Sequence, residues 1–595
     1  MAATILGTAQ VLALPKSWHC LRHGTLCFAE DLRMLEFVIY LISGIGYGFY
    51  FDLNPLETLL VALAVVGVFR GWWPRFPMTR AWRAWTRLAH RRKTAVAAVF
   101  VFALLVRAAL LPVLPAPDPV VSDEFSHLLI ADTLAHGRLT NSTHPMWVHF
   151  ESLHIIQKPT YNSDYFPGQG AVLALGKAMG HPWVVAWLLC AAMCAALCWM
   201  LQAWLPPAWA LFGAMLAVFR FGIASYWVNG YYGGCLAALG GALVLGCYPR
   251  LLRKPEVAMS FLFGLGMAVI GYTRPFEGLA VAVPAAVGIA IAILHGKTPA
   301  WVGIPATAVV LLAVAGLLAY SKAVTGDPLK TPYAVNQATY GWPLGLPWFQ
   351  TREIQFRHTE LQRYYEYERD AHNRNASLLG ELKHSTLKAQ EIWRFYFGPA
   401  LSIGLITLPL VWRRRRLRFL FLCAGLTLFL TLMEFASSAH YTAAATGAFL
   451  AVLMECFRRL RADRRRLVFA APIVMLLILG VRIGLGAMHL PFTQRVNFQS
   501  WCCPTPGNPN KPRILAILDR TEGKHLVLVK PKIDPENLFQ WIYNDADIDA
   551  SRVVWARDMG VEGNRALLDY FRDRKIWLLD PNVDPPTILP YSPRR

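Results

Sequence analysis

Two adjacent carboxylates, Asp123 and Glu124, come shortly after an apolar run that is long enough to cross a lipid bilayer. This spacing predicts that they lie just above the membrane interface, where a lipid-linked substrate presents its head group. Ser122 can cap a helix and acidic residues favour a first helical turn, so an acidic helix start is the competing interpretation. His127 follows Asp123 by four residues on the same helix face, which makes these two the candidate ligands for a divalent metal.

Cationic and aromatic side chains occur farther along the same chain. Lys158 is followed by Tyr161 and Tyr165, and Arg274 stands at the predicted outer end of a membrane span. Lysine and arginine bind phosphate, and aromatic faces stack on sugar rings. An arginine at this depth is costly unless it is paired or functional, and Glu277 offers the alternative of a simple ion pair.

The elements that must position these residues are apolar runs of roughly 17 to 25 residues, the length that crosses a bilayer. They are centred on residues 36–53, 55–73, 95–114, 181–205, 208–228, 233–249, 255–273, 277–295, 299–320, 396–412, 417–436, 442–457 and 467–488. If the spans alternate, the basic stretches 80–93, 250–254, 295–297, 413–418 and 457–466 all fall on one side. The positive-inside rule makes that side cytoplasmic.

The candidate residues fall on the opposite side, which is predicted to be the periplasm or exterior. On that side lie the loop 115–180, the short turns near Asn229 and Arg274, the loop 322–395, the turn at His440 and the tail from about residue 490. We therefore expect an α-helical polytopic membrane protein with about 11–13 transmembrane helices, with its site facing the periplasm or exterior.

Three parts are predicted along the chain. Residues 1–93 hold one or two apolar segments and a basic stretch, residues 94–489 form the transmembrane domain, and residues 490–595 form a small soluble domain. In the last part, strands are predicted at 525–529, 551–556 and 575–580, with a helix at 564–574. The first 33 residues lack the features of a secretory signal, so a translation start at Met34 is a hypothesis that N-terminal sequencing tests.

The composition supports a membrane protein, because 55% of the 595 residues are hydrophobic and only 16% are charged. The net charge of +21 comes from basic clusters beside apolar runs, where they set topology and contact anionic membrane lipids. No basic surface free of membrane segments is visible, so nucleic acid is not an expected partner.

These features resemble the GT-C superfamily of integral-membrane glycosyltransferases, which use polyprenyl-phosphate sugars as donors. The chain looks closest to the bacterial branch near protein mannosyltransferases, the aminoarabinose transferase of lipid A and the Rgt-type galacturonosyltransferases. The resemblance rests on Asp123-Glu124, on YFPGQG at 165–170, on Arg274-Pro275 with Glu277-Gly278, and on GDPLKTPYAVNQATYGWP at 326–343. Where Tyr-Pro-Pro-Gly is expected, this chain has Tyr-Phe-Pro-Gly.

The resemblance implies an inverting transfer of a sugar to a hydroxyl of a cell-envelope acceptor, which is a lipid, a glycan or a protein. Asp123 would take the proton of that hydroxyl, and Glu124 would orient the acceptor or support Asp123. Lys158 and Arg274 would stabilise the leaving phosphate. His440 and Tyr441, near another predicted external helix end, could line the same site.

Two other functions remain open from the sequence. An O-antigen polymerase or ligase would use basic residues of a late external loop, and the chain offers Arg352, Arg357 and His358 there. The alternating charges of residues 351–370 also fit an amphipathic surface helix. A flippase or transporter of lipid-linked sugars is the non-enzymatic alternative, but charged residues inside the spans and related halves are not evident.

Overall fold

The computed structural model of this protein describes most of the chain. The described residues are 54–72, 79–119, 121–342, 346, 349, 351–436, 438–488, 500–502, 510–532 and 541–592. The predicted apolar run 36–53 and the hypothetical start at Met34 lie outside them.

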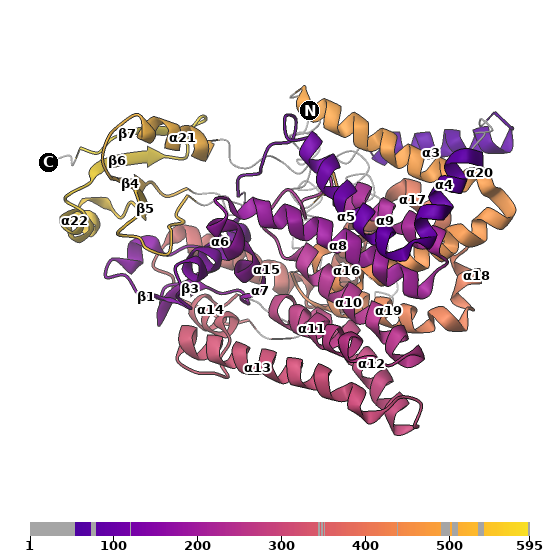
Figure 1. The fold of residues 1–595 in the computed structure, drawn as a ribbon. Coiled ribbons are helices and arrows are strands. Elements are labelled where there is room, and N and C mark those ends of the chain that lie inside the picture. The colour runs from indigo at the N-terminus through magenta and orange to yellow at the C-terminus, as the bar shows by residue number, and fades with distance from the viewer. Residues whose placement is uncertain are drawn as a thin grey trace, which may run out of the picture. The chain divides into compact units, whose positions relative to one another are not determined.

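Helices dominate the described residues, as predicted (Figure 1). The helices of the apolar runs are α3 (Asn54–Phe69), α5 (Arg92–Ala109), α8 (Pro182–Trp204), α9 (Pro207–Phe221), α10 (Gly234–Arg253), α11 (Val257–Thr273), α12 (Pro275–Leu294), α13 (Gly303–Thr325) and α19 (Arg418–Met433). Six described helices are long and apolar enough to cross a membrane, and three shorter apolar helices accompany them. The predicted helical, membrane-spanning fold class is thus confirmed.

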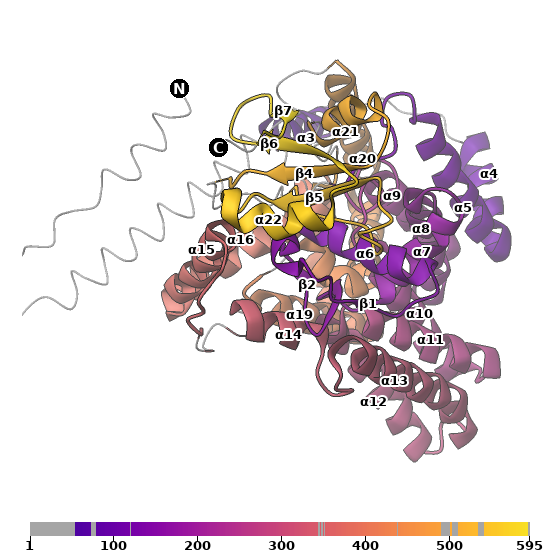
Figure 2. The same ribbon diagram turned by 90° about the vertical axis from the view of Figure 1, so that its left-hand side faces the viewer.

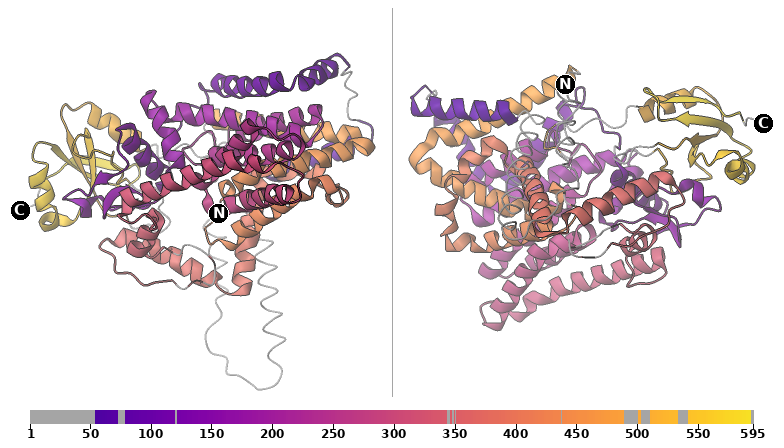
Figure 3. Two further views of the ribbon diagram at one scale, coloured as in Figure 1. Left: turned by 60° about the horizontal axis from the view of Figure 1, so that its bottom comes forward. Right: turned by 180° about the vertical axis from the view of Figure 1, so that it is seen from behind.

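Two helical regions differ from the predicted spans. The runs 442–457 and 467–488 belong to one helix of 42 residues, α20 (Thr446–Ala487), which continues through the basic stretch between them (Figure 3). That stretch contains arginine, leucine and alanine but no glycine or proline, so nothing in it ends a helix. The run 396–412 forms two short helices instead, α17 (Gly398–Leu405) and α18 (Leu408–Trp412), with a proline in the first turn of the second.

The loop 115–180, which is predicted to be external, contains α6 (Ser122–Ala135), a small antiparallel sheet and α7 (Gly168–Ala178). The sheet has the order β1-β3-β2, from Asn141–Ser142, Thr160–Ser163 and Ile155–Ile156. Val121, and not Ser122, occupies the position before the first turn of α6, and the Glu124 carboxylate reaches back to the Val121 N–H at 3.3 Å. This arrangement satisfies a backbone donor that a helix start leaves without a partner.

The predicted α/β arrangement of the tail is confirmed (Figure 2). One sheet has the strand order β5-β4-β6-β7, formed by β4 (His525–Val529), β5 (Val553–Arg557), β6 (Lys575–Asp580) and β7 (Thr587–Pro590). Helix α21 (Asn510–Asp519) precedes β4 in the chain, and α22 (Gly560–Tyr570) connects β5 to β6. β4 pairs in parallel with β5 and β6, and β7 is antiparallel to β6.

The C-terminal sheet domain contacts helix α6. The rings of Phe125 and Tyr543 stack with centroids 4.4 Å apart, and the backbone N–H of Ala546 donates to the Asp132 carboxylate at 2.7 Å. The Tyr161 hydroxyl donates to the carbonyl of Asn544 at 2.9 Å. The domain therefore braces the helix that carries Asp123.

Candidate active site

Asp123 lies in the first turn of α6, where it is half-buried. The hydroxyl of Tyr165, a residue 42 positions away in sequence, donates a hydrogen bond to its Oδ1 atom. The hydroxyl of Ser122 lies 3.4 Å from the other carboxylate oxygen. These contacts orient the Asp123 carboxylate toward Tyr165.

A buried ion pair lies beside Asp123. His154 Nδ1 is 3.2 Å from the carboxylate of Asp164, and both side chains are almost fully buried. Burial alone would lower the pKa of His154, but Asp164 and then Asp123 raise it to about 9, so His154 is a cation at neutral pH. Its backbone φ of 60° is a conformation that non-glycine residues seldom adopt, which indicates that the surrounding structure holds this residue in place.

The charge of His154 acts on Asp123. Burial alone would raise the pKa of the Asp123 carboxyl, but the positive charge of His154, the hydrogen bond from Tyr165 and the nearby His127 together lower it below its ordinary value of 3.8. Asp123 is therefore ionised at neutral pH and can accept a proton.

His127 lies one turn after Asp123, and its ring centroid is 4.7 Å from that of Tyr165. Burial lowers the pKa of His127 to about 3, and the opposing charge of Asp123 does not offset it. Within the described residues, no three side chains of His, Cys, Asp or Glu are grouped so that they could hold a metal ion. Among the described residues, Asp123 and His127 therefore have no third His, Cys, Asp or Glu side chain beside them to complete a metal site.

The segment YFPGQG at 165–170, here called the aromatic turn, brings Tyr165 to Asp123. Helix α7 begins at Gly168, where an added Cβ would lie 2.5 Å from the carbonyl oxygen of Tyr272, so only glycine allows this approach to the end of α11. Tyr165 and Phe166 both contact the ring of Tyr333, with centroids 5.4 and 5.5 Å apart. The aromatic turn, itself part of the loop 115–180, thus contacts both Tyr333 of the loop 322–395 and the end of α11.

Arg274 occupies the junction between α11 and α12, directly after the segment that packs on this turn. Its guanidinium lies 4.0 Å from the ring centroid of Tyr441, and its charge acts on Tyr333 and Tyr165. The half-buried Arg274 side chain makes no direct hydrogen bond or salt bridge with a described residue, but the nearby carboxylate of Glu277 acts on it electrostatically. A cation whose hydrogen-bond donors are not used by any described residue, and which acts on the same aromatic side chains as the ionised Asp123, is suited to an anionic ligand.

Glu124 has a different environment from its neighbour. It is 1% exposed, and its Oε1 atom accepts the backbone N–H of Tyr231 at 2.9 Å while Oε2 accepts that of Val121. An added Cβ at Gly230 would lie 2.8 Å from Oε1, so the chain leaves just enough room for this carboxylate. Glu124 therefore joins the start of α6 to the loop before α10.

His440 and Tyr441 lie in the short helix η4 (Ala439–Ala445). His440 Nδ1 is 3.0 Å from the Tyr226 hydroxyl. Burial and then the charge of Arg274 hold the pKa of His440 well below 6.5, so its ring is neutral. The structure thus brings both residues to Arg274, although the sequence separates them from it by more than 160 positions.

Lys158 and Tyr161 lie apart from Asp123. Lys158 is exposed, its Nζ atom lies 4.3 Å from the Trp147 ring centroid, and it lines a surface pocket together with Lys330. Tyr161 is 4% exposed, and its hydroxyl holds the C-terminal domain. In the described part of the chain, no hydrogen bond or ion pair links either side chain to Asp123 or Arg274.

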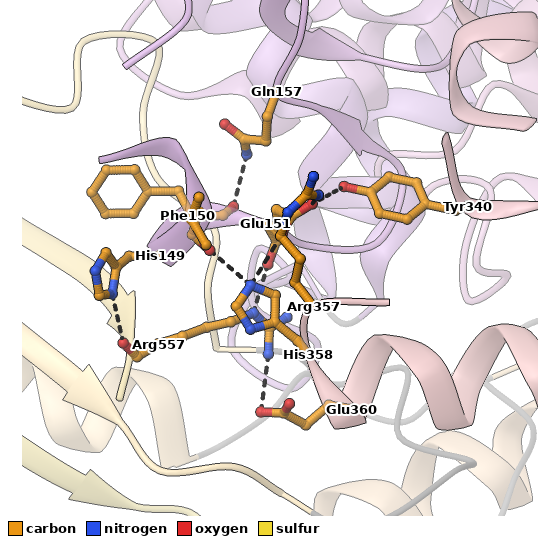
Figure 4. A network of polar contacts seen from close by, with 10 residues as sticks. His149, Phe150, Glu151, Gln157, Tyr340, Arg357, His358, Glu360 and Arg557 are labelled. Atoms are coloured by element: carbon orange, nitrogen blue, oxygen red, sulfur yellow. Dashed lines mark hydrogen bonds and ion pairs between the residues drawn. The ribbon is translucent and has the colours of Figure 1, made fainter. Parts of the chain in front are cut away.

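A second polar network joins the loops 115–180 and 322–395 to the C-terminal domain (Figure 4). The buried Glu151 accepts from the Tyr340 hydroxyl at 3.0 Å and pairs with His358 at 3.0 Å and Arg357 at 3.5 Å. Arg557, 4% exposed, donates to the Glu151 carbonyl at 2.9 Å. Arg357 and His358, two of the three residues offered by the polymerase or ligase alternative, therefore hold the loops together, whereas Arg352 is exposed.

Several residues around Asp123 were not among the site residues predicted from the sequence. His154 was one of several histidines in the first loop, and Asp164 directly precedes Tyr165. Tyr333 lies in the quoted segment 326–343. Glu368, on α15 (Thr359–Asn375), is half-buried, and burial raises its pKa to about 7. Of these residues, only Asp164 could have been found from the local sequence, because it directly precedes the aromatic turn.

Replacing His154 by glutamine is expected to shift the acidic limb of the pH–rate profile to higher pH. The positive charge of His154 lowers the pKa of Asp123, so its removal raises that pKa and leaves less ionised Asp123 at low pH. Rates between pH 6 and 7, about two to three units above the ordinary pKa of Asp, are expected to change less. The profile of purified protein measures this shift. His136→Gln, which removes an exposed histidine of α6's end, is the control, and an unshifted His154→Gln profile would contradict the assignment.

No protein-family model matches this chain, and no curated protein matches it in sequence. An oligosaccharyltransferase is among the similar solved structures. The oligosaccharyltransferase of Archaeoglobus fulgidus in complex with zinc and sulfate is 10% identical, covers 81% of this chain and 67% of its own, and has a TM-score of 0.43.

Two further structures are similar. AglB from the same organism, in complex with an inhibitory peptide and a dolichol-phosphate, is 11% identical over 82% of this chain and 69% of its own, with a TM-score of 0.41. ArnT from Cupriavidus metallidurans in the apo state is 13% identical over 81% of this chain and 92% of its own, with a TM-score of 0.45. At these TM-scores we describe a similarity and take the function from the residues of this chain.

Proposed function

We propose that this chain is a GT-C-type membrane glycosyltransferase that moves a sugar from a polyprenyl-phosphate donor to a hydroxyl of a cell-envelope acceptor. One observation carries the proposal: the ionised carboxylate of Asp123 and the guanidinium of Arg274, which makes no direct hydrogen bond or salt bridge with a described residue, act on the same aromatic residues. This combination supplies a proton acceptor for a hydroxyl and a cation for a leaving phosphate.

In the proposed reaction, the acceptor oxygen attacks the anomeric carbon as its proton passes to Asp123. The bond between that carbon and the phosphate oxygen breaks, and its electron pair leaves with the polyprenyl phosphate. Arg274 stabilises this anion, which is a good leaving group and needs no acid to protonate it. Attack on the face opposite the phosphate inverts the anomeric configuration. One carboxylate therefore suffices, unlike in glycoside hydrolases, which use two.

The other residues have supporting roles in this proposal. Tyr165 aims the Asp123 carboxylate, and Tyr441 supports Arg274 through its ring. Because both Glu124 oxygens accept backbone N–H groups, Glu124 positions α6 rather than contacting the acceptor. We assign phosphate stabilisation to Arg274 rather than to Lys158, which has no contact with this group of residues.

The site is proposed to face the periplasm of a bacterial inner membrane. Its support is the placement of the basic stretches: Arg461, from the stretch 457–466, lies 4.8 Å from the ring centroid of Trp82, in the stretch 80–93. Two stretches that the positive-inside rule assigns to the cytoplasm therefore meet. No observation favours the flippase alternative.

Replacing Arg274 by glutamine is expected to lower kcat/KM for the donor about ten- to 150-fold. A hydrogen bond to a charged group contributes about 1.5–3 kcal/mol, and 1.4 kcal/mol corresponds to tenfold. Arg274→Lys is expected to keep part of the activity, because it keeps the charge but not the planar fork. The release of polyprenyl phosphate from a polyprenyl-phosphate sugar by purified protein measures both variants.

The matched control is Lys322→Gln, which removes an exposed positive charge near the end of α13. It is expected to leave kcat/KM unchanged. Equal losses in Arg274→Gln and Lys322→Gln would mean that general charge attraction, and not a specific contact, explains the effect. Wild-type protein that releases no polyprenyl phosphate with any cell-envelope acceptor would overturn the proposed function.

A further inference from the structure

A pocket of about 700 Å³ lies between α4 (Thr79–His90), α9 and α20, away from the proposed active site. Its lining is divided by chemistry. Three arginines, Arg461, Arg465 and Arg466, contribute from the basic part of α20, and nearly all the other lining residues are apolar or aromatic. Such a division matches an amphiphile with an anionic head and an apolar chain.

The arginines form the cationic end of this pocket. The Arg461 guanidinium lies 4.8 Å from the ring centroid of Trp82 and 6.0 Å from that of Trp209. None of the three has an ion pair with a carboxylate among the described residues. The stretch 457–466 contains six arginines and one aspartate, so its charge is strongly positive whatever its local pairing.

The apolar part of the pocket has the length of one membrane leaflet. It follows α9 from Trp209 to Phe219 and α20 from Arg466 to Leu476, in each case a helical rise of ten residue steps. At 1.5 Å per residue this is about 15 Å, which is half of the roughly 30 Å hydrocarbon core of a bilayer. An acyl chain that starts at the arginines would therefore end near the bilayer midplane.

Helix α4 places the cationic end at the height of the lipid head groups. Trp82 and Trp85 are half-buried toward the pocket, whereas Arg83 and Arg87 of the same helix are exposed. The Trp85 indole N–H donates to the carbonyl of Ala208 at 3.3 Å, which anchors α4 to the start of α9. Amphipathic helices with tryptophan on one face and arginine on the other lie at the membrane interface.

We propose that this pocket binds one anionic phospholipid, with its phosphate at Arg461, Arg465 and Arg466 and an acyl chain along the apolar wall. The leaflet length of the wall favours a phospholipid over a polyprenyl phosphate, whose chain is much longer. The site is independent of the proposed transfer reaction and lies at the end of the protein that carries the basic stretches.

The test measures lipid bound to the purified, delipidated full-length protein after incubation with phosphatidylglycerol or phosphatidylcholine. Wild-type protein is expected to bind about one phosphatidylglycerol per chain and much less phosphatidylcholine. The triple variant R461Q/R465Q/R466Q is expected to bind phosphatidylglycerol about 100-fold more weakly, since each basic residue near a membrane surface contributes about fivefold in affinity. Ile473→Trp, which fills the apolar wall but keeps the arginines, is also expected to lose the bound lipid.

The matched control is R413Q/R415Q/R418Q, which removes three exposed arginines from another predicted cytoplasmic stretch. It is expected to bind lipid like the wild type. If both triple variants lost bound phosphatidylglycerol equally, or if Ile473→Trp still bound it, the lipid would be held by general charge attraction and the proposed lipid pocket would be wrong. Equal affinity for the two lipids, tighter binding of polyprenyl phosphate than of phosphatidylglycerol, or no bound lipid in wild-type protein would also overturn it. Unchanged unfolding temperatures of the variants exclude misfolding as the cause of a loss.

Discussion

Asp123→Asn is expected to lower the transfer rate by about 10²–10⁴-fold, the usual contribution of a positioned general base. Asparagine keeps the size of the side chain and can still accept the Tyr165 hydrogen bond, but it cannot take up the acceptor proton. Binding of the donor phosphate, which is assigned to Arg274, is expected to persist. A radiolabelled donor measures transfer and binding in the same preparation.

The matched control for this change is Asp118→Asn, which removes an exposed carboxylate from the segment just before α6. It is expected to keep wild-type transfer. If Asp123→Asn retained more than a few per cent of the activity, Asp123 would not be the base. If it lost donor binding as well as transfer, the carboxylate would hold the site together and the division of roles between Asp123 and Arg274 would be wrong.

Arg557→Gln is expected to weaken the docking of the C-terminal domain by about 3–5 kcal/mol, as for other buried charge pairs that lose one partner. Arg557 bridges both external loops: it donates to the carbonyl of Glu151 and lies 3.0 Å from the carboxylate of Glu360. The change leaves Glu360, whose side chain is 16% exposed, without this cation. The denaturant dependence of proteolytic cleavage in the domain measures the loss.

The opposite end of β5 provides the control. Arg552 pairs with Asp519 at 2.6 Å, but both side chains are at least half exposed. Arg552→Gln is therefore expected to cost no more than about 1 kcal/mol. Because the domain braces α6 through Phe125 and Tyr543, Arg557→Gln is also expected to lower transfer. Equal stability of the two variants would contradict a bridging role for Arg557.

The helices and the tail sheet were predictable because their signals are local. An apolar run of α8 or α10 fixes a helix by length and composition, and three predicted strands of the tail recur in the sheet. The continuous helix α20 differs from the prediction, because the charged stretch 457–466 is typical of a connection between two spans. Its residues favour a helix, and that local preference prevailed.

The site itself was predictable only in part. Asp123, Tyr165 and Arg274 were identified from sequence, and the structure brings them together with Tyr441. Lys158 was expected in the same group because it precedes the aromatic turn, but β3 lies between it and Tyr165, and its side chain is exposed against Trp147. Sequence proximity does not show which way a loop side chain points.

The contacts that tune Asp123 could not be predicted. His154 influences it only because α6 and the loop before β2 pack together, which places the carbonyl of His154 2.7 Å from the hydroxyl of Ser126. Tyr333 reaches Tyr165 from about 170 residues away, and Tyr543 from more than 400 residues away stacks beside Asp123 on Phe125. Long-range packing of this kind leaves no periodic signal in a single sequence.

The most direct measurement is an experimental structure of the full chain with a polyprenyl phosphate bound. The proposed function predicts that the phosphate lies within hydrogen-bond distance of the Arg274 guanidinium, with space for a sugar between the phosphate and Asp123. A phosphate bound instead in the pocket of Lys158 and Lys330, with Arg274 and Asp123 both far from it, would contradict the proposed function.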